Sequence, residues 1–209
     1  MIAILDYEAG NLTSVERAVR HLGFPCQVTR DAGIIASAER LIFPGVGAAG
    51  QAMDALRALG LEGALRQAVA QAKPVLGICL GCQVIMEASE ENDATCLGLL
   101  PGRVVRFPEP LSEGGLRLKV PHMGWNRLSI KRPHPVLAGL DPEHEFYFVH
   151  SYFPQPARPE FVLATSRHGV EFAAAIGAGS LIACQFHLEK SGEPGLSLLA
   201  NFCRWDGTC

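Results

Sequence analysis

The chain has 209 residues and a formal net charge of −3 at pH 7, and 48% of its residues are hydrophobic. This length and apolar content suffice for one globular domain with a sizeable core, and the scattered lysines and arginines exclude the basic face of a nucleic-acid-binding protein. The absence of a long apolar run and of a signal peptide, together with seven cysteines in apolar segments, predicts a reduced, cytoplasmic protein that does not enter a membrane.

The first half of the chain alternates between apolar runs and amphipathic segments. Their patterns predict strands at 2–5, 26–29 and 41–43 and helices over 15–22, 52–59 and 61–72. We expect Thr13 or Ser14 to cap the first helix and Gly23 to end it. This alternation is typical of a three-layer α/β fold, in which a mainly parallel central sheet is flanked by helices.

A segment rich in glycine, residues 44–50, follows the third predicted strand. Loops at the carboxyl ends of parallel strands form the binding site in sheets of this kind. Glycine lets backbone N–H groups turn toward a ligand, as an oxyanion hole requires. An ordinary strand-to-helix turn explains the same residues, so this segment alone does not identify a site.

The strongest motif surrounds Cys79. Residues 75–78 predict a buried strand, and helical spacing begins at Leu80. The segment Gly-Ile-Cys-Leu-Gly at 77–81 matches the G-x-S-x-G nucleophile elbow with cysteine in place of serine, where small residues are needed because strand and helix approach closely. A helix N-terminus also favours the thiolate. Two other interpretations stay open: a buried, inert cysteine, and a redox pair of Cys79 with Cys82.

The second half of the chain is dominated by predicted strands. They cover 102–107, 116–120, 145–150, 161–165, 172–176 and 181–186, and the later ones form an additional antiparallel region. A polar and aromatic loop is expected at 121–126, and helical spacing returns after Gly195. Glu87, Glu90 and Glu91 are expected at a solvated helix end.

The last predicted strand leads into His187 and Glu189. Two positions apart at a strand end, their side chains are expected on one side, where the carboxylate can orient the imidazole. The imidazole can then take a proton from a thiol elsewhere in the fold. A lone histidine is more often structural, but this pair together with a thiol elbow favours a triad of Cys79, His187 and Glu189.

These two motifs resemble those of the class I (triad) glutamine amidotransferases, and the resemblance spans essentially the whole chain. We therefore interpret residues 1–209 as a single domain of that type. Gly-Ile-Cys-Leu-Gly-Cys-Gln at 77–83 is similar to the family's nucleophile motif, and Gln-Phe-His-Leu-Glu-Lys at 185–190 to its His–Glu motif. Three positions depart from the family pattern, which usually has proline, methionine and glycine where this chain has Leu188, Cys82 and Glu8.

The resemblance implies that the Cys79 thiolate attacks the side-chain amide of L-glutamine, while His187 carries the proton and Glu189 holds the imidazole. It also implies an oxyanion hole made by backbone N–H groups of Leu80 and of the segment formed by Val46 and Gly47. No metal and no other cofactor is expected. The candidates for binding glutamine are Gly47, Gln83, Glu91, Ser151 and Tyr152.

Four segments, at 6–11, 44–47, 121–126 and 147–152, further resemble one branch of the family. Its members supply ammonia to a (β/α)₈-barrel cyclase subunit in histidine biosynthesis. The resemblance implies a heterodimer with this cyclase and low glutaminase activity until the cyclase is bound. The expected docking surface contains His122, Met123, Trp125 and Asn126.

Four alternatives remain open. A glutaminase subunit for anthranilate, guanylate or pyridoxal phosphate synthesis would have a different synthase partner. A cysteine peptidase with a similar elbow would need an open peptide groove instead of a small pocket. A thiol redox protein would lose function on Cys82→Ser, and a catalytically silent binding subunit would not be labelled at Cys79 by a glutamine-mimicking electrophile.

Overall fold

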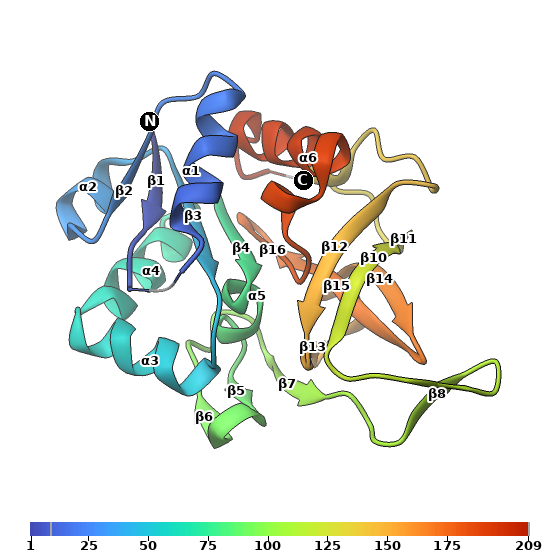
Figure 1. Cartoon of the computed structure of the whole chain (residues 1–209). Helices are drawn as coiled ribbons and strands as arrows, with labels where there is room; N and C mark the ends of the chain where they lie inside the picture. Colours follow the sequence, from blue (N-terminus) through green and yellow to red (C-terminus); the bar gives the residue numbers. More distant parts are fainter. Residues whose placement is uncertain (9, 209) are drawn as a thin grey trace.

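A mixed sheet runs through the middle of the molecule (Figure 1). The computed structural model describes residues 1–8 and 10–208, and in that part of the chain the sheet has eight strands in the order β11-β14-β15-β16-β4-β3-β1-β2. Its parallel half contains β1 (Ile2–Leu5), β2 (Cys26–Thr29), β3 (Arg40–Gly45), β4 (Val75–Cys79) and β16 (Leu181–Cys184). Its antiparallel half contains β15 (Val170–Ala178), β14 (Val162–His168) and β11 (Ser129–Ile130).

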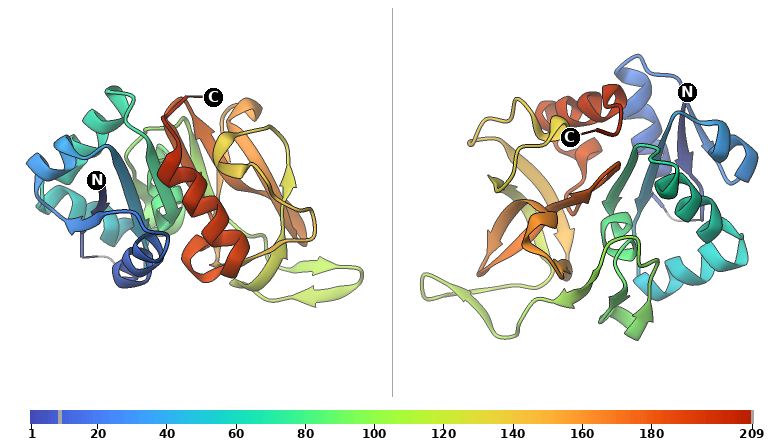
Figure 2. Two further views of the ribbon diagram at one scale, coloured as in Figure 1. Left: turned by 90° about the horizontal axis from the view of Figure 1, so that it is seen from above. Right: turned by 180° about the vertical axis from the view of Figure 1, so that it is seen from behind.

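Helices cover both faces of the parallel half, as Figure 2 shows from above. On one face lie α1 (Leu12–His21) and α6 (Gly192–Arg204), and on the other lie α2 (Ala32–Ser37), α3 (Ala49–Ala58) and α4 (Leu61–Ala70). Helices cover both faces because the strands present apolar side chains on both faces. In strand β1, for example, successive side chains alternate between the two faces. Ile2 and Ile4 pack with the α1 and α6 side, and Ala3 and Leu5 pack with the α2, α3 and α4 side. The three-layer α/β fold predicted from the sequence is confirmed.

Smaller groups of strands and short helices complete the fold. A four-stranded sheet has the order β13 (Tyr152–Pro156), β7 (Gly102–Arg106), β5 (Ala88–Ser89) and β6 (Ala94–Thr95). Two pairs of strands complete the β structure: β10 (His122–Arg127) with β12 (Glu145–His150), and the protruding hairpin β8 (Leu111–Glu113) with β9 (Leu116–Leu118) (Figure 1). The short helices are α5 (Leu80–Val84), η1 (Glu91–Asp93), η2 (Pro135–Leu137), η3 (Pro159–Phe161) and η4 (Leu188–Lys190).

Several local predictions were wrong. Residues 121–126, expected as a loop, mostly form strand β10, because His122 through Arg127 pair in register with β12. Neither Thr13 nor Ser14 caps α1, since the N-cap is Asn11, in a left-handed conformation with φ 76° and without a side-chain cap. The helix α2, which begins at an Asp31 cap, was not predicted.

Two further predictions fail near the site. Strand β3 does not end at Pro44 but continues to Gly45, since both residues still pair with β4. Of the glutamates expected at a solvated helix end, Glu87 and Glu90 are exposed as predicted, but all three lie beyond the end of α5 and bind backbone N–H groups of other segments. Glu90 accepts from the Arg106 N–H at 2.8 Å, and Glu91 accepts from the Ala49 N–H at 2.8 Å.

Within the described ranges, none of the helices combines the length and the apolar character that a bilayer span requires.

Candidate active site

Cys79 lies at the turn between β4 and α5, at the carboxyl edge of the parallel strands (Figure 1). Its backbone has φ 53° and ψ −104°, a strained conformation for a residue with a side chain, as expected at a nucleophile elbow. A Cβ at Gly81 would lie 2.0 Å from the Phe43 carbonyl oxygen, and one at Gly77 would lie 2.9 Å from Ala183 Cβ. Strand and helix therefore approach as closely as the motif predicts, and only glycine fits at these two positions.

The segment after β3 lies beside this elbow. Gly45 pairs with Cys79 in the sheet, and the next residues, Val46 and Gly47, line the same cavity as Leu80. Gly47 has φ 105°, a value open to glycine but strained for other residues. The structure thus brings together the two segments from which the oxyanion N–H groups were expected.

His187 and Glu189 are joined by a short hydrogen bond. Nδ1 of His187 lies 2.8 Å from Oε1 of Glu189, and both side chains are almost completely buried. The predicted reason was wrong, because strand alternation does not align them. β16 ends at Cys184, His187 is the N-cap of η4, and the turn of η4 brings Glu189 back to the imidazole.

The departure at Leu188 leaves this geometry intact. Leu188 is the first residue of η4, a position that suits proline but does not require it, and its side chain is fully buried in the core. The backbone of His187 is fixed by its neighbours, since its N–H donates to the Tyr147 carbonyl at 2.9 Å and its carbonyl accepts from the Ser191 hydroxyl at 2.5 Å.

The environment of His187 favours its charged form. Burial lowers the pKa of His187, but the Cys79 thiol and the Glu189 carboxylate outweigh burial and raise this pKa to about 9. Burial would raise the pKa of Glu189, but its hydrogen bonds with His187 and Asn11 lower it below the usual value. Because Nδ1 faces the carboxylate, Nε2 is the nitrogen left to exchange a proton. Within the described residues Nε2 has no hydrogen-bond partner.

Two residues that contact this triad were missed as site residues. The Asn11 amide donates to Glu189 Oε1 at 2.5 Å. The Gln185 amide donates to the Cys79 sulfur at 3.8 Å, and its carbonyl oxygen accepts from Gln83 at 3.1 Å. Both belong to segments that carry the family resemblance, but spacing gave no sign that a residue 178 positions away would meet Glu189.

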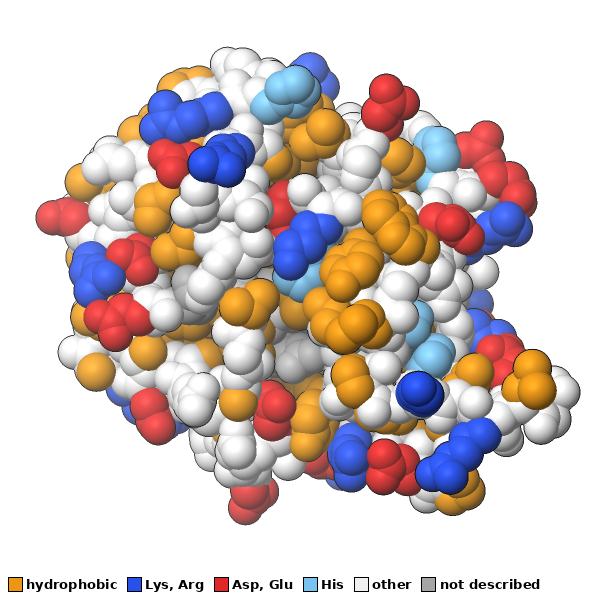
Figure 3. All heavy atoms as spheres, viewed as in Figure 1, with side chains coloured by type: hydrophobic (Ala, Val, Ile, Leu, Met, Phe, Trp, Pro, Cys, Tyr) orange, Lys and Arg blue, Asp and Glu red, His pale blue; other side chains and the backbone are white. Residues whose placement is uncertain are grey.

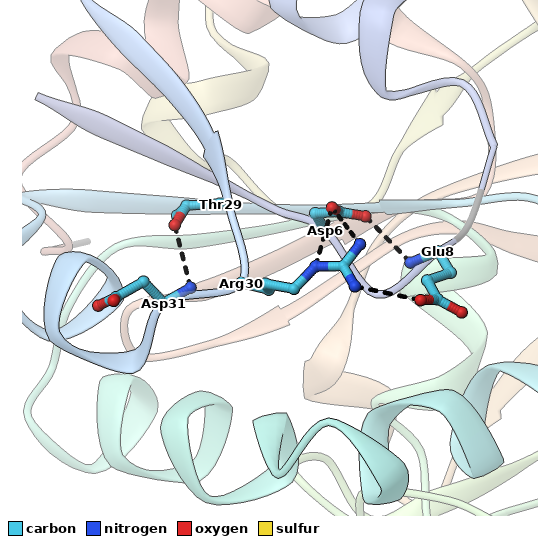
Figure 4. Close-up of polar contacts among 5 residues, drawn as sticks. All are labelled: Asp6, Glu8, Thr29, Arg30 and Asp31. Carbon is cyan, nitrogen blue, oxygen red and sulfur yellow. Dashed lines mark hydrogen bonds and ion pairs between the residues drawn. The ribbon is translucent and has the colours of Figure 1, made fainter.

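The loop that carries Asn11 begins with a charged cluster, shown in Figure 4. Arg30 contacts the Asp6 carboxylate at 2.6 Å and the Glu8 carboxylate at 3.1 Å. The hydrogen bond from Arg30 lowers the pKa of Asp6. Glu8 has φ 67°, which explains why glycine is usual at this position, and its ion pair with Arg30 helps to hold the strained backbone.

A cavity of about 280 Å³ opens beside the Cys79 thiol, a size that suits a small ligand. All five residues predicted to bind glutamine are part of its lining, together with both segments of the expected oxyanion hole. The lining consists of Val46, Gly47, Cys79, Leu80, Gln83, Glu91, Pro121, Val149, His150, Ser151, Tyr152 and His187.

The four residues predicted for partner docking divide between surface and core. Met123 is 64% exposed and Trp125 is 53% exposed, and Figure 3 shows hydrophobic side chains gathered on this face over β10 and β12. Asn126 is half-buried. His122 is only 4% exposed, so its side chain does not belong to a docking surface, because alternation along β10 turns residues 122 and 126 inward and residues 123 and 125 outward.

The structure bears on two further expectations. Cys82 is fully buried, and burial raises its pKa well above the usual value, so it is a poor partner for a redox pair with Cys79. Among residues 1–8 and 10–208, no group of three or more histidine, cysteine or acidic side chains is arranged to hold a metal ion.

Comparison with known proteins gives a consistent result. Residues 3–205 match the family model described as glutamine amidotransferase class-I. The chain is 54% identical over 206 residues to imidazole glycerol phosphate synthase subunit HisH of Nitratidesulfovibrio vulgaris strain DP4, covering 98% of this chain and 96% of that protein. It is 50% identical over 210 residues to the subunit of the same name from Methylococcus capsulatus, with coverage of 98% and 96%.

Solved structures share the fold at much lower identity. A crystal structure of a glutamine amidotransferase superposes with a TM-score of 0.68 at 22% identity, covering 96% of this chain and 98% of that one. The structure of PurLQS from Thermotoga maritima superposes with a TM-score of 0.71 at 15% identity, covering 96% of each chain.

Proposed function

The chain belongs to the class-I glutamine amidotransferase family, and we propose that it is the glutaminase subunit of imidazole glycerol phosphate synthase. In this role it hydrolyses L-glutamine to glutamate and ammonia for histidine biosynthesis. The observation that carries the proposal is that one small cavity is lined by a strained cysteine elbow and by a histidine bound to a buried carboxylate. The 54% identity to a HisH subunit over nearly the whole chain supports the choice of synthase.

The reaction begins with the thiolate. Because His187 is held in its charged form, the thiol proton is already on Nε2 of His187 when the Cys79 sulfur attacks the side-chain amide carbon of glutamine. Backbone N–H groups of Leu80 and of the segment formed by Val46 and Gly47 stabilise the oxyanion. The tetrahedral intermediate collapses as the imidazolium protonates the amide nitrogen, which breaks the C–N bond, releases ammonia and leaves a γ-glutamyl thioester on Cys79.

Water completes the cycle. His187 takes a proton from the attacking water, the thioester C–S bond breaks, and glutamate leaves as the sulfur is protonated again. Throughout, Glu189 stabilises the imidazolium that forms in each half of the cycle and holds Nδ1 protonated, so that Nε2 always faces the reaction. Gly47, Gln83, Glu91, Ser151 and Tyr152 hold the substrate in the cavity.

The ammonia must reach a second active site before water protonates it. We assign that site to a (β/α)₈-barrel cyclase subunit, which uses ammonia to make imidazole glycerol phosphate and AICAR. The exposed Met123 and Trp125 side chains on β10 form the centre of the docking surface for this partner in a heterodimer, because exposed aromatic residues and methionines are typical interface anchors.

The test is a glutaminase assay of the chain, first alone and then with a barrel cyclase that carries its ligand. The variants Cys79→Ala and Cys82→Ala are assayed in the same way as a matched pair. We expect turnover to depend on the cyclase, to vanish in Cys79→Ala and to persist in Cys82→Ala. A redox function predicts that Cys82→Ala is also inactive. Equal turnover with and without the cyclase would contradict the assignment to this synthase, and no glutamine turnover under any condition would contradict the glutaminase itself.

A further inference from the structure

Three histidines outside the triad meet behind the glutamine cavity. His122 and His150 are buried opposite each other on β10 and β12, and the His168 ring from β14 stacks on His122 with ring centroids 4.3 Å apart. The three phenylalanine rings that pack around His122 and His150 make the surroundings apolar; they are Phe107, Phe148 and Phe172. Nothing in the catalytic cycle above uses these histidines.

The hydrogen bonds of this group run in one direction. Nδ1 of His150 lies 2.9 Å from the Tyr152 carbonyl oxygen, which can only accept, so Nδ1 carries the proton. Burial lowers the pKa of His150 to about 3 and of His122 to about 4, so both rings are neutral. Nε2 of His150 is therefore an acceptor, and its partner 3.1 Å away, Nδ1 of His122, must donate.

The donor to His122 can be assigned in the same way. Nε2 of His122 has no proton left, and it faces the Asn126 amide nitrogen at 3.4 Å, which donates. The other amide proton of Asn126 binds the Arg167 carbonyl at 2.7 Å. Donation therefore runs from Asn126 through His122 and His150 to the carbonyl of Tyr152, with both imidazoles in the Nδ1–H tautomer.

This series of hydrogen bonds ends at Tyr152, one of the residues proposed to bind the substrate. The Tyr152 carbonyl accepts a second hydrogen bond, at 2.9 Å, from the Gln83 amide, which also donates to Gln185. Gln185 in turn contacts the Cys79 sulfur. His150, Tyr152 and Gln83 all line the cavity beside Cys79.

We propose that His122 and His150 are positioning residues for glutamine binding: their directional hydrogen-bond chain fixes the Tyr152 carbonyl, and with it the Ser151–Tyr152 backbone and the Gln83 amide in the glutamine cavity. The inference rests on the proposed glutaminase function and adds two residues to its substrate site. Among the described residues, neither histidine is hydrogen-bonded to a member of the triad. Their loss should therefore weaken substrate binding more than turnover.

The first test measures the wild-type protein. We expect the ring ¹⁵N chemical shifts of the wild-type protein at neutral pH to identify both His122 and His150 as neutral Nδ1–H tautomers. Signals are assigned by their loss in single variants. An Nε2–H tautomer or a protonated ring at either position would overturn the proposal, and this result is independent of whether the chain hydrolyses glutamine.

The second test separates binding from turnover. His150→Phe keeps the ring packing but removes the donor to Tyr152, so KM for glutamine should rise about five- to tenfold while kcat changes less than about twofold. His150→Asn keeps a donor near the Nδ1 position and should restore most of the affinity. His134→Phe is the matched control, since His134 is also buried, packs on Trp205 and lies outside the cavity lining.

The outcomes distinguish this inference from the proposed function. An active wild type whose KM is the same in His150→Phe and His134→Phe would refute the positioning role and leave the glutaminase standing. A wild type without glutaminase activity would refute the function, and the tautomer measurement would still report on the hydrogen-bond chain. If His150→Phe does not fold, His122→Phe serves the same purpose, because it removes the donor that holds Nε2 of His150.

Discussion

The side-chain amide of Asn11 donates a 2.5 Å hydrogen bond to the Glu189 carboxylate, although 178 positions separate the two residues. Asn11 follows strand β1 and Glu189 lies in η4, so the contact exists only when the parallel sheet is assembled. Both Asn11 and His187 bind the same oxygen, Oε1. The orientation of the imidazole thus depends on the loop after β1 as well as on η4.

Removing this contact should impair turnover. We expect Asn11→Ala to lower kcat about tenfold with little change in KM for glutamine, because a hydrogen bond to a buried charged group contributes about 1.5–3 kcal/mol. Steady-state kinetics with the cyclase present check this result. Asn201→Ala is the control, since the Asn201 side chain donates to the carbonyls of Val136 and Ala138 and lies outside the cavity lining. Equal kcat values in both variants would show that Asn11 does not position Glu189.

Two glycines should respond in opposite ways to alanine. A Cβ at Gly81 would lie 2.0 Å from the Phe43 carbonyl oxygen, whereas a Cβ at Gly63 in helix α4 has no neighbour within 4 Å. We expect Gly81→Ala to destabilise the fold by more than about 3 kcal/mol and Gly63→Ala to stabilise it by about 0.5–1 kcal/mol. Urea denaturation measures both. A mild effect of Gly81→Ala would mean that the elbow is looser than the structure indicates.

The raised pKa of His187 makes stability depend on pH. The folded pKa is about 9 and the usual value is 6.5, so the stabilisation from the charged imidazole is complete below about pH 6.5 and is lost as the pH rises through 9. Compared with that of the His187→Gln variant, the free energy of unfolding of wild type should fall by up to about 3 kcal/mol across this pH range. Parallel urea denaturation curves at about pH 6 and about pH 10 give the difference. A constant difference would contradict the raised pKa.

Replacing Glu8 tests the strained loop. Its φ of 67° suits glycine, and its ion pair with Arg30 is exposed to solvent. Replacing a left-handed residue by glycine relieves about 1–2 kcal/mol of backbone strain, and an ion pair this exposed to solvent contributes less. We therefore expect Glu8→Gly to stabilise the fold by about 0.5–1 kcal/mol and Glu8→Ala, which loses the ion pair without relief, to destabilise it slightly. Thermal unfolding of the two variants decides whether strain or the ion pair dominates.

The elements that could be predicted from the sequence are those with a strong local cause. The apolar run of β4 and the two glycines around Cys79 predicted the elbow, because sterics over a few residues dictate that turn. The pairing of His187 with Glu189 was also predicted, although the turn of η4 and not strand alternation produces it. By contrast, strand β10 was missed. In the part of the chain that the structure describes it pairs with β12 alone, which is distant in sequence, and its polar residues gave no strand pattern.

Local sequence therefore determined the identity of the proposed reactive groups: the thiol at an elbow, the imidazole with its carboxylate, and the glycine-rich turn beside them. Their convergence on one cavity, the contact of Asn11 with Glu189, and the histidine chain from Asn126 to Tyr152 arise from the order in which the strands pair. Each of these joins segments that are distant in sequence, and no short-range pattern encodes which strand lies next to which. The physical reason is that burial drives the sheet to assemble as a whole, and only then do polar groups from its separate strands become neighbours.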